Sequence, residues 1–340
     1  MNNPWKFESS RPHHPLSGSR WHPPSRLARN QCCARAIDRA RVVHRGRVAL
    51  AGKSAKSLIV VAIAAAGGLA FGWFAGSDSV EWSGTSVFFL CTLVALAVNW
   101  IAFVPAAIAQ TEKYYDLTGS ITYTAMILTA LALAAPHDAR AWVVAAMVLV
   151  WTGRLGIFLF KRISKDGGDS RFDTIKVHPA RFLVAWTLQA LWGIFTAAAA
   201  IAIITTSDPA PLGAFFWLGA ALWLFGFGIE VVADQQKRAF KHDDANEGEF
   251  IKSGLWAWSQ HPNYFGEIVL WTGIAAMAVP LLSGWSWLVL ISPIFVYILL
   301  TSVSGIPMLD RKAIKRWGER EDFIRYRKQT PKLIPLPPKS

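Results

Sequence analysis

The chain has 340 residues, of which 53% are hydrophobic and 17% are charged, and its formal net charge is +13. The hydrophobic residues lie in blocks of about 20 with few charges, the length that crosses the ~30 Å hydrocarbon layer of a membrane. Such repeated blocks exclude a soluble domain with one core. The basic residues lie in the ends and loops without a nucleic-acid motif, so we expect no nucleic-acid partner.

The first 56 residues form a basic N-terminal arm that is rich in Arg, His and Pro and lacks hydrophobic periodicity. This composition predicts disorder, because it cannot build a core. The first hydrophobic block begins too late for an ordinary secretory signal. A transit peptide, a polybasic membrane tether and a translation start placed too far upstream stay open. Cys32, Cys33 and Cys91 have the spacing of neither a metal site nor a disulfide framework.

The hydrophobic blocks after the arm must be helices, because the backbone has no water to bond within a bilayer. The predicted fold class is therefore an all-α integral membrane protein, a bundle of about eight transmembrane helices, with seven as the alternative. The third block is short, and it would form a hairpin with the fourth around Pro136. The expected spans are residues 57–75, 86–109, 121–135, 140–160, 181–204, 212–232, 265–282 and 285–304.

Lys and Arg are unevenly distributed between these spans. The arm holds 12, residues 161–181 hold six, residues 233–264 hold four, and the tail after residue 304 holds ten. Residues 110–120, on the same side as these, hold one, and the short connections on the other side hold none or, at Arg140, one. Positive residues collect on the cytosolic side of membrane proteins. We therefore expect both termini in the cytosol, an even number of spans, and cytosolic loops that form a polar site.

A charged side chain inside a span is costly, so each one is a functional candidate. Arg154 lies about two turns inside the cytosolic end of the fourth span, in the segment Trp151-Thr152-Gly153-Arg154. Alternatively, its long side chain extends to the membrane interface and has no role in a site.

Polar residues recur about every four positions where the sixth span ends, at Glu230, Asp234, Arg238 and then Lys241 or His242. This spacing places them along one face of a helix that leaves the membrane. A solvated helix with intrahelical ion pairs is the alternative. Glu230 still lies among hydrophobic residues, and the mixed signs suit a phosphorylated ligand with hydroxyl groups. The pattern therefore favours a binding face.

The next motif is His261-Pro262-Asn263-Tyr264-Phe265-Gly266-Glu267. Pro262 disfavours helix at the residue before it, so we expect a helix to begin just after His261. The free N–H groups of its first turn suit a phosphate. His261, Asn263 and Tyr264 add donors, and Glu267 follows one turn later. The alternative is a polar cluster at a membrane entrance that binds no ligand.

The tail mixes hydrophobic residues with a strongly basic run, which predicts a helix at the membrane interface. Attraction to anionic headgroups explains most of this charge. Tyr326 and basic residues such as Arg311 are further candidates, because they would close over a ligand from the cytosolic side.

These motifs resemble the C-terminal domain of the steroid 5α-reductase family, in particular its bacterial branch of uncharacterised membrane proteins labelled DUF1295. The resemblance covers about residues 110–335 and is strongest over 226–335. Its carriers are Glu230…Asp234…Arg238, the motif from His261 to Glu267, and Tyr326-Arg327-Lys328 with Leu333-Ile334-Pro335. It divides the chain into the arm 1–56, a membrane domain 57–335 whose residues 226–335 are the cofactor-binding half, and a tail 336–340.

The resemblance implies a reductase in a bacterial inner membrane. Such an enzyme transfers hydride from NADPH to an enone carbon–carbon double bond of a lipid-like or steroid-like substrate. The motif positions and the resemblance together assign ten residues to the cofactor: Glu230, Asp234, Arg238, Lys241, His261, Asn263, Tyr264, Glu267, Arg311 and Tyr326.

The catalytic candidates are Asp116, Tyr123, Trp151 and Arg154. Arg154 matches an arginine beside the substrate cavity of the family. Trp151 stands where steroid reductases have a tyrosine that donates a hydrogen bond to the substrate carbonyl, and an indole cannot transfer a proton. Asp116 falls near their amide–carboxylate pair, and Tyr123 would replace the missing hydroxyl. Glu230 stands where those enzymes have an amide.

Two other classes of function stay open. Membrane methyltransferases for prenylcysteine or phospholipid headgroups share a His-Pro-x-Tyr-x-Gly element and bind S-adenosylmethionine. Glu267 after Gly266 favours the reductase, because the methyltransferases generally place an apolar residue there. The second alternative is a non-catalytic lipid-binding scaffold, for which Trp151 is the best argument.

Overall fold

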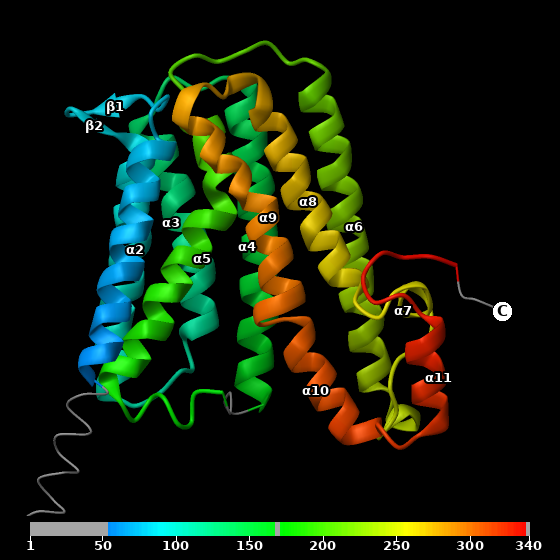
Figure 1. The fold of residues 1–340 in the computed structure, drawn as a ribbon. Helices are drawn as coiled ribbons and strands as arrows, with labels where there is room; N and C mark the ends of the chain where they lie inside the picture. The colour runs from blue at the N-terminus through cyan, green and yellow to red at the C-terminus, as the bar shows by residue number, and fades with distance from the viewer. Residues whose placement is uncertain (1–53, 167–170, 338–340) are drawn as a thin grey trace, which may run out of the picture. The chain divides into compact units, whose positions relative to one another are not determined.

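The computed structural model describes residues 54–166 and 171–337, with side chains for all of these except residues 161–166. Within these ranges eight helices are long and hydrophobic enough to cross a membrane (Figure 1). The predicted all-α class and the eight spans are confirmed, and the chain is an integral multi-pass membrane protein. Of the predicted arm, residues 1–53 lie outside the described residues, so its disorder stays a prediction.

The first half of the bundle holds four long helices and a short hairpin. The helix Ser54–Ala75 is followed by β1 (Glu81–Trp82) and β2 (Thr85–Ser86), which pair antiparallel. The other three helices are α2 (Val87–Ile108), α3 (Tyr115–Leu133) and α4 (Ala139–Asp166). The third span begins earlier than the predicted residue 121. Its first turns are polar, and the helix satisfies the threonine hydroxyls there at carbonyls one turn back, as Thr118 bonds to Tyr114 at 2.8 Å.

The second half contains α5 (Pro179–Thr205), α6 (Ala214–His242), η1 (Asp244–Asn246), α7 (Leu255–Trp258), α8 (Pro262–Ala278) and η2 (Val279–Leu281). The eighth span is broken into η3 (Gly284–Leu290), α9 (Ile291–Ile298), the π-turn η4 (Leu299–Val303) and α10 (Ile306–Trp317). The helix α11 (Glu321–Gln329) follows. As predicted, α8 begins just after His261, with Pro262 in its first position.

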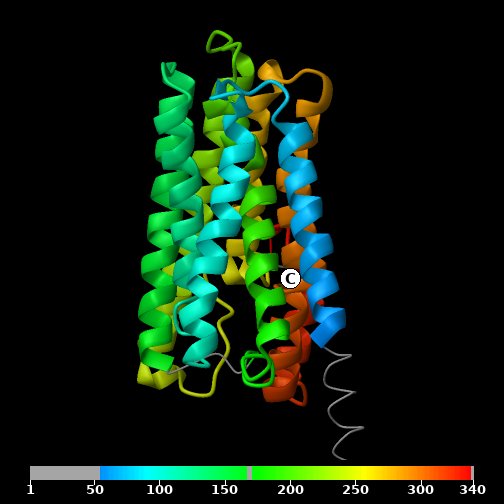
Figure 2. The same cartoon turned by 90° about the vertical axis from the view of Figure 1, so that its left-hand side faces the viewer.

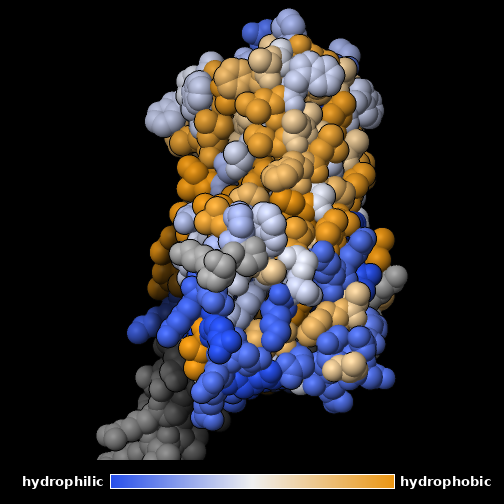
Figure 3. Space-filling view, turned by 90° about the vertical axis from the view of Figure 1, so that its right-hand side faces the viewer, coloured by the Kyte–Doolittle hydropathy of each residue, from blue (hydrophilic) through white to orange (hydrophobic). Residues whose placement is uncertain are grey.

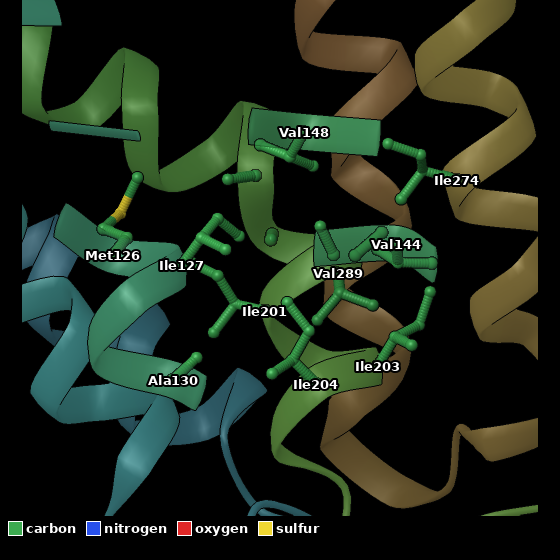
Figure 4. Close-up of a cluster of buried hydrophobic side chains, with 14 of the residues drawn as sticks. Met126, Ile127, Ala130, Val144, Val148, Ile201, Ile203, Ile204, Ile274 and Val289 are labelled. Atoms are coloured by element: carbon green, nitrogen blue, oxygen red, sulfur yellow. The ribbon is translucent and has the colours of Figure 1, made fainter. Parts of the chain in front are cut away.

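The helix α5 lies at the centre of the bundle. It contacts α2, α3, α4, α8 and α9, and all of residues 197–200 are fully buried alanines. Around it lies a cluster of buried hydrophobic side chains, the apolar core, part of which is drawn in Figure 4. The labelled members of the apolar core are Met126, Ile127, Ala130, Val144, Val148, Ile201, Ile203, Ile204, Ile274 and Val289.

The spans run roughly along one axis, so the connections fall at two ends (Figures 1 and 2). Residues 109–114, 171–178 and 243–254 lie at one end with α10 and α11, and we call it the basic end. In Figure 3 hydrophobic residues cover most of the length, and hydrophilic residues gather at this end. Which side of the membrane the basic end faces stays a prediction. Exposed indoles at the opposite end fit a membrane interface: Trp73, Trp82, Trp142, Trp217, Trp285 and Trp287.

The helices α6 and α8 touch backbone to backbone at two glycine pairs. A Cβ atom on Gly266 would lie 2.5 Å from the carbonyl oxygen of Gly226 and 2.8 Å from the backbone nitrogen of Glu230. Gly219 and Gly273 repeat the same contact two turns away. Small residues allow this close approach in membranes, where van der Waals packing drives helix association. The contact sets the polar face of α6 against the first turns of α8.

The C-terminal segment after α11 folds back over the start of α8. The backbone N–H of Gln260 donates to the carbonyl of Pro331 at 2.8 Å, and that of Leu336 to the carbonyl of Trp258 at 3.0 Å. The Tyr326 hydroxyl donates to the carbonyl of Trp256 at 2.7 Å. These bonds fix the tail to the residues that precede α8.

His261 is enclosed beneath this segment. Its ring stacks on Tyr264, with centroids 5.6 Å apart, and its Nε2 lies 3.7 Å from Oδ1 of Asp310. Asp310 also pairs with Lys332 at 2.8 Å and with Arg327 at 3.4 Å. Burial outweighs the attraction of Asp310 and lowers the pKa of His261 to about 4. The imidazole is therefore neutral at pH 7.

We predict that Gly266→Ala lowers the melting temperature of the protein in detergent. The added methyl group meets backbone atoms of α6 that cannot move alone, so the helices must separate, at a cost of about 1–3 kcal/mol. Gly228→Ala is the matched control, because its Cβ would meet nothing within 4 Å. It should be neutral or raise stability by up to about 1 kcal/mol, since alanine favours helix. Equal effects of both variants would contradict the glycine contact.

The buried histidine predicts a pH dependence of stability. Between pH values of about 6.5 and about 4 the unfolded chain binds a proton at His261 that the folded protein does not. The free energy of unfolding should therefore fall as the pH drops through this window. The charges that face the His261 ring are those of Asp310, which raises its pKa, and of Lys237 and Lys332, which lower it. Melting temperatures of the wild type should fall more steeply than those of His261→Asn. Parallel slopes in the two proteins would refute this assignment.

Candidate functional site

A hydrogen-bonded network around Arg154 links α4, α6 and α8 inside the basic half of the bundle. Its Nη1 donates to Oε1 of Glu230 and its Nη2 to Oδ2 of Asp234, each at 2.5 Å. The Asn263 amide donates to Oδ1 of Asp234, and the Trp151 indole N–H donates to Oε2 of Glu230, each at 3.2 Å. We call these five residues the ion cluster. Its arginine is held inside the bundle by two carboxylates rather than directed to the interface.

The local structure explains why these side chains meet. Glu230 and Asp234 are four residues apart in α6, so one guanidinium reaches both carboxylates. Trp151 and Arg154 are three residues apart on α4 and face α6 together. The helix start at Pro262 places Asn263 in the first turn of α8. Buried charges persist only when they are paired and hydrogen-bonded, and this network supplies both conditions.

Glu267 lies one turn after Asn263 and adds a third carboxylate. It is partly buried and interacts electrostatically with Glu230, Asp234 and Arg154. Within the part of the chain that the structure describes, no hydrogen bond to its carboxylate occurs. Carboxylates here outnumber the guanidinium, and Glu267 presents an open acceptor. No group of His, Cys, Asp and Glu in the described ranges has an arrangement that could hold a metal ion.

Two aromatic rings, those of Tyr123 and Trp271, pack against the Trp151 ring of the ion cluster. The Trp151 ring lies nearly perpendicular to those of Tyr123 and Trp271, with centroids 5.3 and 5.1 Å away. The Trp151 N–H is committed to Glu230, so it is not free for a substrate carbonyl. The Tyr123 hydroxyl, by contrast, is buried and has no hydrogen-bond partner among the described residues. Among the described residues, the Trp271 indole N–H also lacks a partner, so Tyr123 and Trp271 carry the free donors of this group.

The predicted cationic residues lie at the basic end, outside the ion cluster. Arg238 is exposed, and its guanidinium lies 5.4 Å from the centre of the Phe158 ring. Lys241 is exposed at the end of α6, and the exposed Arg311 donates to the carbonyl of Pro307 at 3.0 Å. Within the described ranges none of the three has an ion-pair partner. They are available to an anionic ligand.

The remaining candidates are more distant from the ion cluster or already bonded. Asp116 lies in the first turn of α3, about 10 Å along the helix from Tyr123. The hydroxyl of Tyr326 donates to the backbone carbonyl of Trp256. His261 and Tyr264 pack under the C-terminal segment rather than into the cluster.

Two residues near the site were not among the sequence candidates. Asp310 pairs with the C-terminal segment and lies beside His261. It could not be found from the motif, because the contact joins residues far apart in the chain. Trp271 lies four residues after Glu267, on the same face of α8. That spacing is a signal that was available in the sequence.

Comparison with known proteins gives limited matches to curated relatives. An uncharacterised protein of Schizosaccharomyces pombe is 23% identical over 185 residues, which cover 45% of this chain and 54% of that protein. A 3-oxo-5-alpha-steroid 4-dehydrogenase 1 of Bos taurus is 34% identical over 74 residues, which cover 22% of this chain and 28% of that protein. The chain thus spans about half or less of the length of these relatives. No solved structure matches it.

A family model gives a broader match. The model described as a protein of unknown function, DUF1295, matches residues 102–330. This range contains the ion cluster, the aromatic rings beside it and every predicted site residue. The chain therefore belongs to the DUF1295 family, as its motifs predicted, and it bears a weak similarity to a steroid dehydrogenase.

Proposed function

We propose that the protein is a membrane-embedded reductase that transfers hydride from NADPH to the enone double bond of a lipid-like substrate. The observation that carries this proposal is the ion cluster. Residues that the motifs assigned to the cofactor, Asp234 and Asn263, meet the residue assigned to the substrate side, Arg154, in one hydrogen-bonded network. The bovine relative, named for its action on a 3-oxo steroid, supports the same chemistry.

The residues present fit NADPH. The open carboxylate of Glu267 can accept hydrogen bonds from a carboxamide group. Arg238, Lys241 and Arg311 lack ion-pair partners among the described residues and suit the phosphates, with the two arginines able to bind them bidentately. When bound, NADPH supplies the hydride that the β-carbon of the enone accepts.

The protein side of the reaction needs a donor at the substrate oxygen. As the double bond is reduced, negative charge builds on the carbonyl oxygen, and the α-carbon then takes a proton from water. Tyr123 donates a hydrogen bond to that oxygen, and the low local dielectric strengthens the interaction. Glu230 and Asp234 hold Arg154 in place before the ligands bind, which removes the need to reorganise it.

The basic end is proposed to face the cytosol of a bacterium, with the protein in the inner membrane. Lys and Arg are concentrated in the connections and helices of this end, as on the cytosolic side of other membrane proteins. Both termini are then cytosolic. NADPH enters from that side, and the hydrophobic substrate enters from the bilayer.

A second candidate, a methyltransferase that uses S-adenosylmethionine, has one observation in its favour. Three carboxylates, those of Glu230, Asp234 and Glu267, face a single guanidinium. Such an excess of negative charge suits a ligand that carries sulfonium and ammonium groups. The free arginines at the basic end favour a phosphorylated ligand instead.

Ligand-dependent melting temperatures separate these functions. NADPH at 100 times its dissociation constant should stabilise the detergent-purified protein by about 2.7 kcal/mol. Arg238→Ala should weaken the shift, because it removes a phosphate partner. Arg325→Ala is the control, an exposed arginine of α11 outside the candidate set. Stabilisation by S-adenosylmethionine alone would exclude the reductase, and stabilisation by neither ligand would favour the scaffold.

Arg154→Lys should reduce the rate of NADPH oxidation at least about tenfold while the protein still folds. Lysine keeps the charge but lacks the planar fork that bonds Glu230 and Asp234 at once. Lys176→Arg is the control, at a separate ion pair in which Lys176 lies 2.9 Å from Glu112. A substrate-dependent rate that survives Arg154→Lys unchanged would remove the ion cluster from the mechanism.

A further inference from the structure

Three buried polar groups beside the ion cluster lack hydrogen-bond partners. They are the Tyr123 hydroxyl, the Thr196 hydroxyl and the Trp271 indole N–H. The side chains are at most 6% exposed. A buried polar group without a partner is unfavourable, because its lost hydration is not replaced, and native proteins contain few of them. Other buried polar groups in the described ranges also lack partners, but these three lie on neighbouring helices next to the ion cluster, where a ligand would complete their bonding.

These groups converge from three helices. The rings of Tyr123 on α3 and Trp271 on α8 stack with centroids 6.2 Å apart and planes 28° apart. The Thr196 hydroxyl on α5 lies close enough to that of Tyr123 to act on it, yet outside the geometry of a hydrogen bond. A small shift on ligand binding would bring the two hydroxyls together.

Their position defines the polarity of the ligand. Towards the basic end, Glu267 lies one turn from Trp271 on α8. Towards the opposite end, Met126 and Ile274 lie one turn from Tyr123 and Trp271 and belong to the apolar core (Figure 4). The donors thus lie between the charged ion cluster and a mainly hydrophobic part of the bundle. A ligand here has a polar atom at one point and hydrocarbon beyond it.

The chemistry of the donors defines that polar atom. The indole N–H of Trp271 can only donate, so the ligand atom must accept. None of the three groups is a cation, and Glu267 is close, so an anionic headgroup is disfavoured. A neutral carbonyl oxygen, with two lone pairs, meets these requirements.

We infer that Trp271 and Tyr123 donate to the two lone pairs of a ketone oxygen in a hydrophobic ligand, and that Thr196 positions Tyr123 by donating to its hydroxyl oxygen. The inference rests on the proposed function for the kind of ligand, a ketone. It adds Trp271 as a binding residue and Thr196 as a positioning residue. The ketone is then held where the ion cluster meets the apolar core.

The test measures equilibrium binding of two radiolabelled probes to the full chain in lipid nanodiscs without NADPH. One probe is a 4-ene-3-oxo steroid, and the other is the same steroid without its 3-oxygen. The wild type should bind the ketone about 20-fold more tightly, as two hydrogen bonds predict. Trp271→Phe should weaken ketone binding about fivefold and leave the deoxy probe unchanged. Thr196→Val should act similarly, and Thr196→Ser should restore binding.

Trp186→Phe is the matched control. Trp186 is equally buried and its N–H is also unpaired among the described residues, but it packs with Phe172 and Phe182 in a separate cluster. Its substitution should change the binding of neither probe. If Trp271→Phe does not fold, as circular dichroism would show, the Thr196 variants carry the test.

Three results would overturn the inference: no binding of the ketone, equal binding of both probes by the wild type, or equal losses for both probes in the variants. The NADPH-dependent melting shift, measured on the same samples, tests the proposed function separately. A donor-dependent preference for the ketone without an NADPH shift would support the carbonyl site and reject the reductase. An NADPH shift without that preference would support the reductase and reject the carbonyl site.

Discussion

The site depends on the backbone contact between α6 and α8. Gly226 and Gly266 let the backbones of the two helices come into direct contact. Glu230 follows Gly226 by one turn of α6. Glu267 follows Gly266 directly. The glycines therefore bring the carboxylates of both helices to the same level of the bundle. A side chain at either glycine would separate the helices before any polar contact formed.

Arg154 compensates the negative charges of Glu230 and Asp234. Two carboxylates four residues apart on α6 would repel each other in a medium of low dielectric. The guanidinium of Arg154 bonds to both, and Asn263 and Trp151 donate to the oxygens that remain. Glu267 is left without such a bond within the described residues, so it is the acceptor that a ligand can use. Packing and charge thus leave one carboxylate, unpaired among the described residues, beside a fully bonded network.

The sequence predicted features that depend on local spacing. The eight spans, the helix start after His261 and the shared face of Glu230 and Asp234 follow from hydropathy, Pro262 and helical periodicity. Contacts between distant segments could not be predicted in this way. No periodicity shows that the Trp151 N–H reaches Glu230, or that the tail encloses His261. The unpaired donor of Trp271 is visible only once three helices are placed together.

The two departures from the steroid reductase pattern touch each other. By the resemblance, we expect Trp151 to stand in place of a tyrosine and Glu230 in place of an amide. In the structure, the indole N–H of the first donates to the carboxylate of the second. A carboxylate at this position needs one more donor than Arg154 provides, and the indole supplies it. The tryptophan therefore serves as a hydrogen-bond donor to Glu230. Its ring also packs against Tyr123, whose hydroxyl, unpaired among the described residues, is the donor that we propose for the substrate carbonyl.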